Sequence, residues 1–470
     1  MLLHAFRILF ILLEVIVLFN LLIVVHELGH FLAARWRGLK IEKFGVWFGK
    51  PIWKKTIGGV QYSLGTLPFG GFVALPQLAP MDIIEGETDA DRAKLPPISV
   101  LDKIIVAIAG PLFSLLLALV FATLVWGVGH PVGEADMTTV IGYVEPGSPA
   151  EKAGLKAGDK IFEVDGNRVT RFSGMNDSVV WNVIRSEGET IPFLVERNNQ
   201  QLSFSVVPYK AATSGWRRKS VRQVLIYPAS KPIIDEVEAG SPAAAAGLQR
   251  GDVIDGFNGQ PIYNAIALAD FIRQHPNERL KLDVQRGPRR FQTTLRPVPM
   301  MTHGKMMPRI GIAWDTTGQM TIAHPNPIEQ VYDSVTSTLN TIEAVASPKS
   351  DVKLQHLSGP VGIVRIYYLL FESDRGWQLA LWFSVILNVN LAILNMLPIP
   401  VLDGGHIVLA LIEAVRRKPV NIRVLEIVQT GCAVLIIGYI AYVSFFDVGD
   451  WLGEKREAAA PNPTSQPAKP

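Results

Sequence analysis

Four long stretches of the chain are almost entirely apolar, and the segments between them are rich in polar residues. Residues 104–129, 376–402 and 427–446 contain no charged side chain, and residues 8–34 contain only five polar ones. Because about 20 apolar residues cross the hydrocarbon core of a bilayer, this pattern predicts four transmembrane helices. The first stretch is too long for a cleaved signal peptide and lacks a strongly basic region before it, so we expect it to be retained as a helix.

The distribution of basic residues predicts how these helices are oriented. The loop 35–103 holds ten Lys and Arg residues, and the short loop 413–423 holds four. Since cytoplasmic loops carry an excess of Lys and Arg, both loops are expected on the cytoplasmic side. The N-terminus, the long segment 131–375 and the C-terminal tail are then expected on the outside.

The long external segment contains an internal repeat. Residues 144–169 return as residues 237–262, and 13 of the 26 aligned positions are identical. In each copy a Ser-Pro pair predicts the start of a short helix, and an Asp-Gly or Asn-Gly pair predicts a hairpin turn. The repeat therefore predicts two small α/β domains, which we place at 131–222 and 223–303.

Shorter elements are expected on both sides of the membrane. The residues Val60–Leu64 and Gly70–Leu75 have the composition of short strands. Asn326 followed by Pro327 predicts a helix that runs to about residue 346. The Ala- and Pro-rich end of the chain, within residues 448–470, predicts a disordered tail.

Composition excludes several classes of function. The 470 residues carry 45 basic and 42 acidic side chains, and a net charge of +3 is too balanced to indicate a nucleic-acid partner. Charged residues make up only 19% of the chain, below the ~25% of average soluble domains. The single cysteine, Cys432, excludes both an intramolecular disulfide and a zinc site made of cysteines alone.

The end of the first apolar stretch carries a candidate metal site. The sequence His26-Glu27-Leu28-Gly29-His30 has the HExxH pattern, in which two histidines four residues apart share one helix face. Two neutral imidazoles on one face can hold a zinc ion, and the glutamate beside them can transfer a proton. Ionisable residues are costly inside a membrane, which favours a functional role. The alternative is that these side chains simply extend to the interface near the cytoplasmic face.

A catalytic zinc site needs a third protein ligand, and Asp403 is the candidate. It follows a charge-free stretch whose end is expected on the same side of the membrane as the histidines. Pro398 and Pro400 break the helix just before it, and irregular backbone at membrane depth requires surrounding protein or a water-filled cavity. Two alternatives remain: Asp403 could cap a helix, and His406 could be the ligand, although we expect His406 to have a supporting or structural role.

Two motifs together resemble a known family. HExxH in the first stretch and Asn395-Met-Leu-Pro398-Ile-Pro400-Val-Leu-Asp403-Gly-Gly in the third resemble the site-2 proteases, which are intramembrane zinc metalloproteases. The repeated Gly-Ser-Pro-Ala…Ala-Gly-Leu…Gly-Asp string resembles bacterial PDZ domains. Tandem PDZ domains narrow the resemblance to the bacterial regulator of sigma-E protease type, and the resemblance covers nearly the whole chain.

The resemblance implies a role for each residue that matches the motifs. His26, His30 and Asp403 are the expected ligands of one zinc ion per chain. Glu27 is the expected catalytic base, and Asn395 is expected to help hold the substrate.

The resemblance also extends to a membrane-associated β element. Residues 67–73 match it, and we expect Gly70, Gly71, Phe72 and Val73 to bind substrate as an added strand. One position departs from the family: Ser114 stands in the Ala-Gly-Pro-x-x-Asn pattern where Asn is usual, which puts a supporting contact in doubt.

The fold class implied is a polytopic α-helical membrane protein with four transmembrane helices, two external PDZ-like α/β domains and the β element. The implied activity is hydrolysis of peptide bonds within or near transmembrane segments, in anti-sigma factors of envelope-stress signalling or in signal-peptide remnants. The implied partners are transmembrane protein substrates, peptide or protein ligands of the PDZ-like domains, and the lipid bilayer. The implied location is the bacterial inner (cytoplasmic) membrane, with the PDZ-like domains periplasmic or extracytoplasmic.

The expected organisation along the chain is as follows. The segments are 1–35 (first transmembrane helix, with HExxH), 36–98 (cytoplasmic β region), 99–130 (second helix), 131–222 and 223–303 (PDZ-like domains), 304–375 (juxtamembrane helical region), 376–412 (third transmembrane segment), 424–447 (fourth helix) and 448–470 (tail).

Two other classes of function compete with proteolysis. A zinc-dependent membrane transporter is disfavoured because only one metal cluster is predicted and Glu27 is not needed for coordination. A PDZ adaptor without catalysis would require loss of the site, whereas all four predicted catalytic residues are present.

Overall fold

The computed structural model describes residues 2–78, 95–96, 98–213, 217–302, 305–315, 318, 320–418 and 420–459. The chain divides into two compact units. The membrane unit comprises Met1–His130, Ala323–Leu339 and Ser358–Phe445, and the repeat unit comprises Pro131–Ile322, Asn340–Leu357 and Phe446–Pro470. Arg92 and Lys94, which contributed to the predicted orientation, lie outside the described residues.

Four helices are long and apolar enough to cross a membrane, and they coincide with the four stretches predicted from the sequence. Their lengths fit the ~20 residues that a bilayer requires. Their orientation stays a prediction. The helices are α1 (Leu2–Trp36), α3 (Val100–Val128), α10 (Gly376–Asn395) and α12 (Ile422–Ala459).

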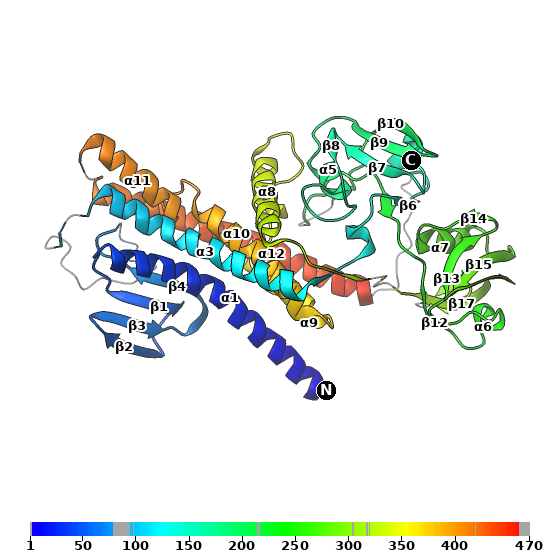
Figure 1. Cartoon of the computed structure of the whole chain (residues 1–470), viewed down its shortest axis with the longest axis horizontal. Coiled ribbons are helices and arrows are strands. Elements are labelled where there is room, and N and C mark those ends of the chain that lie inside the picture. Colours follow the sequence, from blue (N-terminus) through cyan, green and yellow to red (C-terminus); the bar gives the residue numbers. More distant parts are fainter. Residues whose placement is uncertain are drawn as a thin grey trace. The chain divides into compact units, whose positions relative to one another are not determined.

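The helix α3 is the centre of the membrane unit. It packs against α1, α10 and the shorter helix α11 (Asp403–Arg416), as Figure 1 shows. Ala118 and Ala122 on α3 are fully buried, and their small side chains allow Leu22 of α1 and Val385 of α10 to approach. This packing brings the ends of α1 and α10 to the same region of the helix bundle.

A four-stranded sheet follows α1. Its strands are β1 (Lys43–Phe48), β2 (Trp53–Ile57), β3 (Val60–Leu64) and β4 (Leu67–Ala74), in the order β2-β3-β1-β4. The two strands predicted from the sequence correspond to β3 and β4. Strand β4 is antiparallel to β1 and lies at one edge of the sheet, where it also contacts α1. The sheet therefore presents an edge strand next to the first transmembrane helix.

Two helices follow the repeats. The predicted helix is α8 (Pro327–Ala346), and the side-chain oxygen of Asn326 accepts the backbone N–H of Ile328 at 2.9 Å, as the Asn-Pro start predicted. The helix α9 (Pro360–Glu372) begins at Pro360. Its fully buried Tyr367 hydrogen-bonds Ser384 of α10 at 2.8 Å, which fixes α9 against the third span.

The repeat unit contains two copies of one architecture. Repeat 1 forms the sheet β10-β9-β7-β8, and repeat 2 forms the equivalent sheet β16-β15-β13-β14. In each copy the Ser-Pro pair starts a short helix capped by the serine, as predicted. The elements of repeat 1 are β6 (Ile141–Val144), α4 (Pro149–Ala153), β7 (Lys160–Val164), β8 (Asn167–Arg168), α5 (Val179–Arg185), β9 (Ile191–Arg197), β10 (Gln200–Val206) and β11 (Ile226–Pro228). Those of repeat 2 are β12 (Ile234–Val237), α6 (Pro242–Ala245), β13 (Val253–Phe257), β14 (Gln260–Pro261), α7 (Ala265–Gln274), β15 (Leu280–Arg286), β16 (Arg289–Leu295) and β19 (Ile312–Trp314).

Each repeat contains, at equivalent positions, an ion pair between an arginine and a buried aspartate. Arg197 binds Asp159 in repeat 1 at 2.6 Å, and Arg286 binds Asp252 in repeat 2 at 2.7 Å. Both aspartates are essentially inaccessible to solvent. The duplication therefore extends beyond the identical residues to the interactions that hold the Gly-Asp turn.

The predicted domain boundaries need correction. Strand β11 (226–228) pairs with β6 of repeat 1, and β19 (312–314) pairs with β12 of repeat 2. Repeat 1 therefore extends past the predicted end at 222, and repeat 2 past the predicted end at 303. The sequence did not indicate these strands because three residues are too few to show an alternating pattern.

The predicted tail also begins later than expected. Helix α12 continues to Ala459, so residues 448–459 are helical and not disordered. Arg218 forms ion pairs with Asp447 and Asp450 on this part of the helix, at 2.5 and 2.8 Å. The following Glu, Lys, Arg and Ala residues are strong helix formers. The rest of the predicted tail, residues 460–470, lies outside the described residues.

Candidate metal centre

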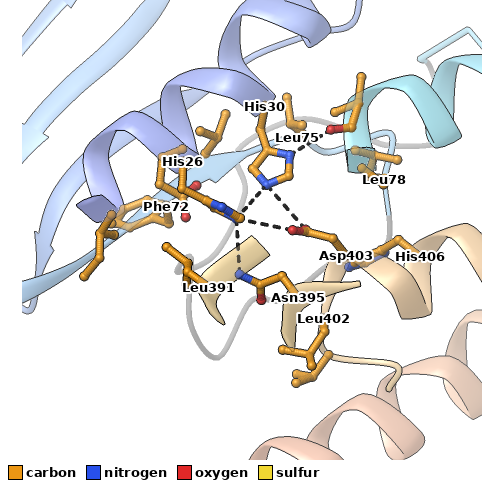
Figure 2. A pocket seen from close by; sticks show the side chains of 17 residues that line it. His26, His30, Phe72, Leu75, Leu78, Leu391, Asn395, Leu402, Asp403 and His406 are labelled. Carbon is orange, nitrogen blue, oxygen red and sulfur yellow. Dashed lines mark hydrogen bonds and ion pairs between the residues drawn. The ribbon is translucent and has the colours of Figure 1, made fainter. Parts of the chain in front are cut away.

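Three predicted ligands meet at one point of the membrane unit (Figure 2). His26 and His30 lie one turn apart on α1, and Asp403 is the first residue of α11. The Nε2 atoms of the two histidines are 3.2 Å apart. The carboxylate oxygens of Asp403 lie 3.2 Å from Nε2 of His26 and 3.4 Å from Nε2 of His30. The tertiary structure thus joins residues separated by more than 370 positions in the sequence.

The far side of each imidazole is held by α3. Nδ1 of His30 donates to the backbone oxygen of Val106 at 2.8 Å, because a carbonyl can only accept. Nδ1 of His26 lies 3.0 Å from the hydroxyl of Ser114, whose oxygen can accept a hydrogen bond from the imidazole N–H. With the protons on Nδ1, both Nε2 atoms carry lone pairs that face Asp403. Such partners on the second nitrogen are typical of metal-ligating histidines.

The arrangement fits a metal cation. Two imidazole lone pairs and a carboxylate repel one another unless a positive charge lies between them. Oδ2 of Asp403 is buried and, within the described residues, accepts no hydrogen bond. Two histidines and one carboxylate form a donor set of the kind found in catalytic zinc sites, which keep a further position open.

Close approach of α3 to α1 depends on two glycines. A Cβ atom on Gly110 of α3 would lie 2.1 Å from Nε2 of His30, and one on Gly29 of α1 would lie 2.4 Å from the backbone oxygen of Ala109. Any side chain at either position would push the helices apart or enter the metal centre. Gly29 is therefore needed within the HExxH pattern for packing, beside the residues predicted to carry the chemistry.

The loop between α10 and α11 places Asp403. The chain leaves α10 at Asn395 and passes Pro398 and Pro400 before α11 begins. Cβ atoms on Gly404 and Gly405 would lie 2.2 and 2.1 Å from backbone oxygens of this loop, so the loop wraps tightly around the start of α11. Asp403 caps no helix end through its side chain, and its carboxylate is directed to the histidines.

A cavity of about 230 Å³ opens beside the three ligands. Glu27 lines it together with Gly71 of β4, and a Cβ atom on Gly71 would lie 3.2 Å from Cγ of Glu27. The edge strand β4 therefore runs past the glutamate predicted to transfer protons. Gly70, with φ of +85°, has no room for a side chain because a Cβ atom would lie 1.9 Å from the ring of Phe48.

Other predicted site residues also border this cavity. Phe72 and Val73 line it, so three of the four residues predicted to bind substrate border the cavity, and Gly70 does not. Nδ2 of Asn395 lies 3.5 Å from Nε2 of His26. His406 lines the cavity as well, but it is not one of the three residues whose donor atoms converge. This position is compatible with the supporting or structural role expected for His406.

Two contributors were missed or undervalued in the sequence. The backbone oxygen of Val106 carries no signal in a sequence, because any residue supplies one. Ser114 was expected to leave a contact in doubt, yet it is fully buried and lies within hydrogen-bond distance of His26. The Ala109-Gly110-Pro111 string before it was the available signal for this part of α3.

Comparisons with known proteins indicate a metallopeptidase over most of the chain. The model of peptidase family M50 matches residues 14–438. A protein of Neisseria meningitidis named as a zinc metalloprotease is 29% identical over 450 residues, which cover 92% of this chain and 97% of that protein. The regulator of sigma-E protease RseP of Escherichia coli K12 is 28% identical over 446 residues, again with 92% and 97% coverage.

Solved structures match a smaller part of the chain. The PDZ domain of an SdrC-like protein from Listeria monocytogenes is 21% identical, covers 19% of this chain and 90% of that structure, and has a TM-score of 0.17. The corresponding domain from Listeria innocua is 23% identical, covers 18% and 92%, and has a TM-score of 0.16.

Proposed function

The chain belongs to peptidase family M50, and from this premise we propose that it is an intramembrane zinc endopeptidase with one zinc ion per chain. Membership confirms the resemblance to the site-2 proteases and makes the chain a metallopeptidase. The observation that carries the finer proposal is the convergence of His26, His30 and Asp403 beside Glu27 at the end of an apolar helix. A hydrolytic site at this depth selects peptide bonds within or near transmembrane segments.

The chemistry follows from the donor set and the neighbouring glutamate. His26, His30 and Asp403 would hold the zinc ion, which when bound would act as a Lewis acid toward water and a peptide carbonyl. Glu27 accepts the proton that the attacking water loses and then delivers it to the amide nitrogen as the C–N bond breaks. The hydrogen bond from His30 to Val106 keeps the imidazole oriented throughout.

The sheet edge supplies a place for the substrate. A transmembrane helix hides its carbonyls in its own hydrogen bonds, so the helix must unwind before cleavage. Unwound backbone in lipid leaves polar groups unpaired at a cost of several kcal/mol each. Within the described residues β4 pairs only with β1, so its other edge can pair with the unwound segment. We propose that Gly70 to Val73 bind substrate in this way and that Asn395 helps to hold it.

Substrate and partner classes come from the relatives. RseP is named for its regulation of sigma E, and we propose that this chain likewise cleaves membrane proteins such as anti-sigma factors or signal-peptide remnants. The repeats, proposed as PDZ domains, would bind peptide or protein ligands by strand addition. The four apolar helices support residence in the bacterial inner membrane, and we propose that the repeats lie on the periplasmic side.

The competing functions make different demands on the site. A silent adaptor has no use for Glu27 next to the ligands, and a transporter requires a path that continues beyond one cluster. In the described part of the chain, His26, His30 and Asp403 form the one group of donors able to hold a metal.

The proposal is tested by separating metal binding from catalysis. Purified wild-type protein should contain about one zinc, and a His26→Ala/His30→Ala variant should lose it. Glu27→Gln should keep zinc but not cleave a short membrane-embedded substrate, and His324→Ala serves as a control histidine in the same unit. Zinc retained in the double variant, or cleavage by Glu27→Gln at the wild-type rate, would contradict the proposed site.

A further inference from the structure

The segment that follows α8 is buried against repeat 1. Ser350 and Val352 are only 2% and 5% exposed, although they lie outside any helix or strand. Val352 belongs to an apolar cluster with Trp181 of α5 and Ala344 of α8, and Ile184 of α5 packs against the same cluster. A connecting segment of this kind is usually exposed, so its burial needs a reason.

The residue between them makes a charged contact with the same repeat. One carboxylate oxygen of Asp351 lies 2.6 Å from Nζ of Lys210, and the other lies 3.1 Å from Nε of Arg222. The side chain of Arg222 is only 6% exposed. Burial alone raises the pKa of Asp351, but hydrogen bonds from Lys210 and Arg222 outweigh it and hold the pKa below its usual value.

These contacts fall just before a strand of repeat 1 that has a free edge, and the residue after Arg222, Gln223, forms an isolated bridge with Tyr209. Strand β11 pairs with β6 on one side and, within the described residues, with no strand on the other. Val224, just before β11, shares a core cluster with Val179 and Val183 of α5. Arg222 precedes this strand and Trp181 lies on this helix. PDZ domains bind an extended peptide along such a strand, beside a helix.

We propose that Ser350–Val352 is an internal ligand that occupies the peptide groove of repeat 1. The Asp351 carboxylate takes the place of a peptide's terminal carboxylate, and Val352 fills the pocket for its apolar side chain. A peptide that ends in an apolar residue with a free carboxylate binds only by displacing this segment. The inference rests on the proposed peptide binding by the repeats and does not depend on proteolysis.

Repeat 2 lacks the residues that hold the internal ligand. The core positions Val179 and Val183 of α5 correspond to Leu268 and Ile272 of α7, 89 positions later. By the same offset, Trp181 corresponds to Asp270 and Ile184 to Arg273, and these two residues form an ion pair with each other.

The strand side differs as well. The backbone N–H of Ala150 bonds the carbonyl oxygen of Val224 in repeat 1, and the N–H of Ala243 bonds the carbonyl oxygen of Ile310 in repeat 2. Val224 therefore corresponds to Ile310, 86 positions later. Arg222 therefore corresponds to Pro308. The apolar pocket and its arginine are specific to repeat 1, so the segment has one matching groove.

The test measures peptide binding by the full-length protein. The probe is a fluorescent peptide with the sequence of residues 345–352 and a free terminal carboxylate, read by anisotropy. A tethered segment that acts at an effective concentration of ~1 mM and has an intrinsic Kd of ~0.1 mM for the groove weakens a competing peptide about tenfold. We expect Asp351→Asn/Val352→Ser to bind the probe about tenfold more tightly than wild type, and Arg222→Ala in that background to abolish binding. Lys349→Ala, a change at an exposed neighbour, should behave as wild type.

Two outcomes would overturn the inference in distinguishable ways. Equal binding by wild type and the released variant means that the groove is open and the internal ligand is wrong. Binding by neither means that repeat 1 is not a peptide site, and that part of the proposed function fails while the protease assignment stands.

A crosslink checks the placement directly. In a Cys432→Ser background, Ile184→Cys/Val352→Cys should form a disulfide under mild oxidation and should bind the probe only after reduction. Arg273→Cys/Val352→Cys, which pairs the segment with the equivalent position of repeat 2, should not crosslink. Failure of the first pair to crosslink in protein that retains zinc would overturn the placement of Val352.

Discussion

Nδ1 of His26 lies 3.0 Å from the hydroxyl oxygen of Ser114, so a side chain of the second apolar helix orients a proposed metal ligand of the first. Ser114 is fully buried, and the contact spans 88 positions of sequence. It takes the place of the longer amide side chain that the resemblance led us to expect. The shorter hydroxyl suffices because the two helices approach closely at Gly29 and Gly110.

We predict that Ser114→Ala weakens zinc binding by about tenfold, since loss of an outer partner of a metal-ligating histidine costs 10–100-fold in affinity. Competition with a chelator of known affinity measures this change. Ser384→Ala removes a buried serine of α10 that bonds Tyr367 instead, and it should leave zinc affinity unchanged. Equal affinities in Ser114→Ala and wild type would mean that the contact does not orient His26.

Gly110→Ala should remove zinc while every proposed ligand remains. The added Cβ atom would lie 2.1 Å from Nε2 of His30, which forces the ring or the helix to move. Gly127→Ala is the matched control on the same helix, because a Cβ atom there meets no other atom within 4 Å. Metal analysis and cleavage should show loss only in the first variant, and normal zinc content in Gly110→Ala would argue against the close approach.

Proline in β4 should reduce cleavage without removing zinc. Phe72→Pro and Val73→Pro each delete one backbone N–H, and because adjacent N–H groups point to opposite edges, one of the two faces the free edge. That variant should lose about tenfold in rate, in line with a lost hydrogen bond of about 1 kcal/mol. Lys54→Pro and Lys55→Pro in β2, at the opposite edge of the sheet, are the controls. Helix-breaking residues in the substrate should partly restore cleavage, whereas wild-type rates in both β4 variants would remove the added-strand step.

The buried ion pair of repeat 2 should make its stability depend on pH. Burial raises the pKa of Asp252, but the hydrogen bonds from Arg286 outweigh it and leave the pKa below its usual value. The stabilisation from this carboxylate is therefore complete above about pH 4 and is lost as pH falls through the lowered pKa. Asp252→Asn should lower the unfolding temperature of the repeat unit by about 5 °C at pH 7. The difference from wild type should shrink below pH 4, and a difference that does not change with pH would contradict this account.

The sequence by itself determined the elements whose cause is local. Apolar stretches of sufficient length gave the four long helices, and Asn326 with Pro327 fixed the start of α8. The Ser-Pro and Gly-Asp signals located the elements shared by the two repeats. The spacing of His26 and His30 was enough to predict two ligands on one helix face, because helix geometry alone brings them together.

Only the tertiary structure decided how distant segments meet. Asp403 becomes a neighbour of the histidines because α3 holds both α1 and α11, and the tight turn at Gly404 and Gly405 sets its direction. The pairing of β11 and β19 with the starts of their repeats, and the burial of residues 350–352, likewise depend on contacts between remote parts of the chain. Such contacts are set by packing and by the pairing of buried polar groups, and these are properties of the folded chain that a short sequence pattern does not contain.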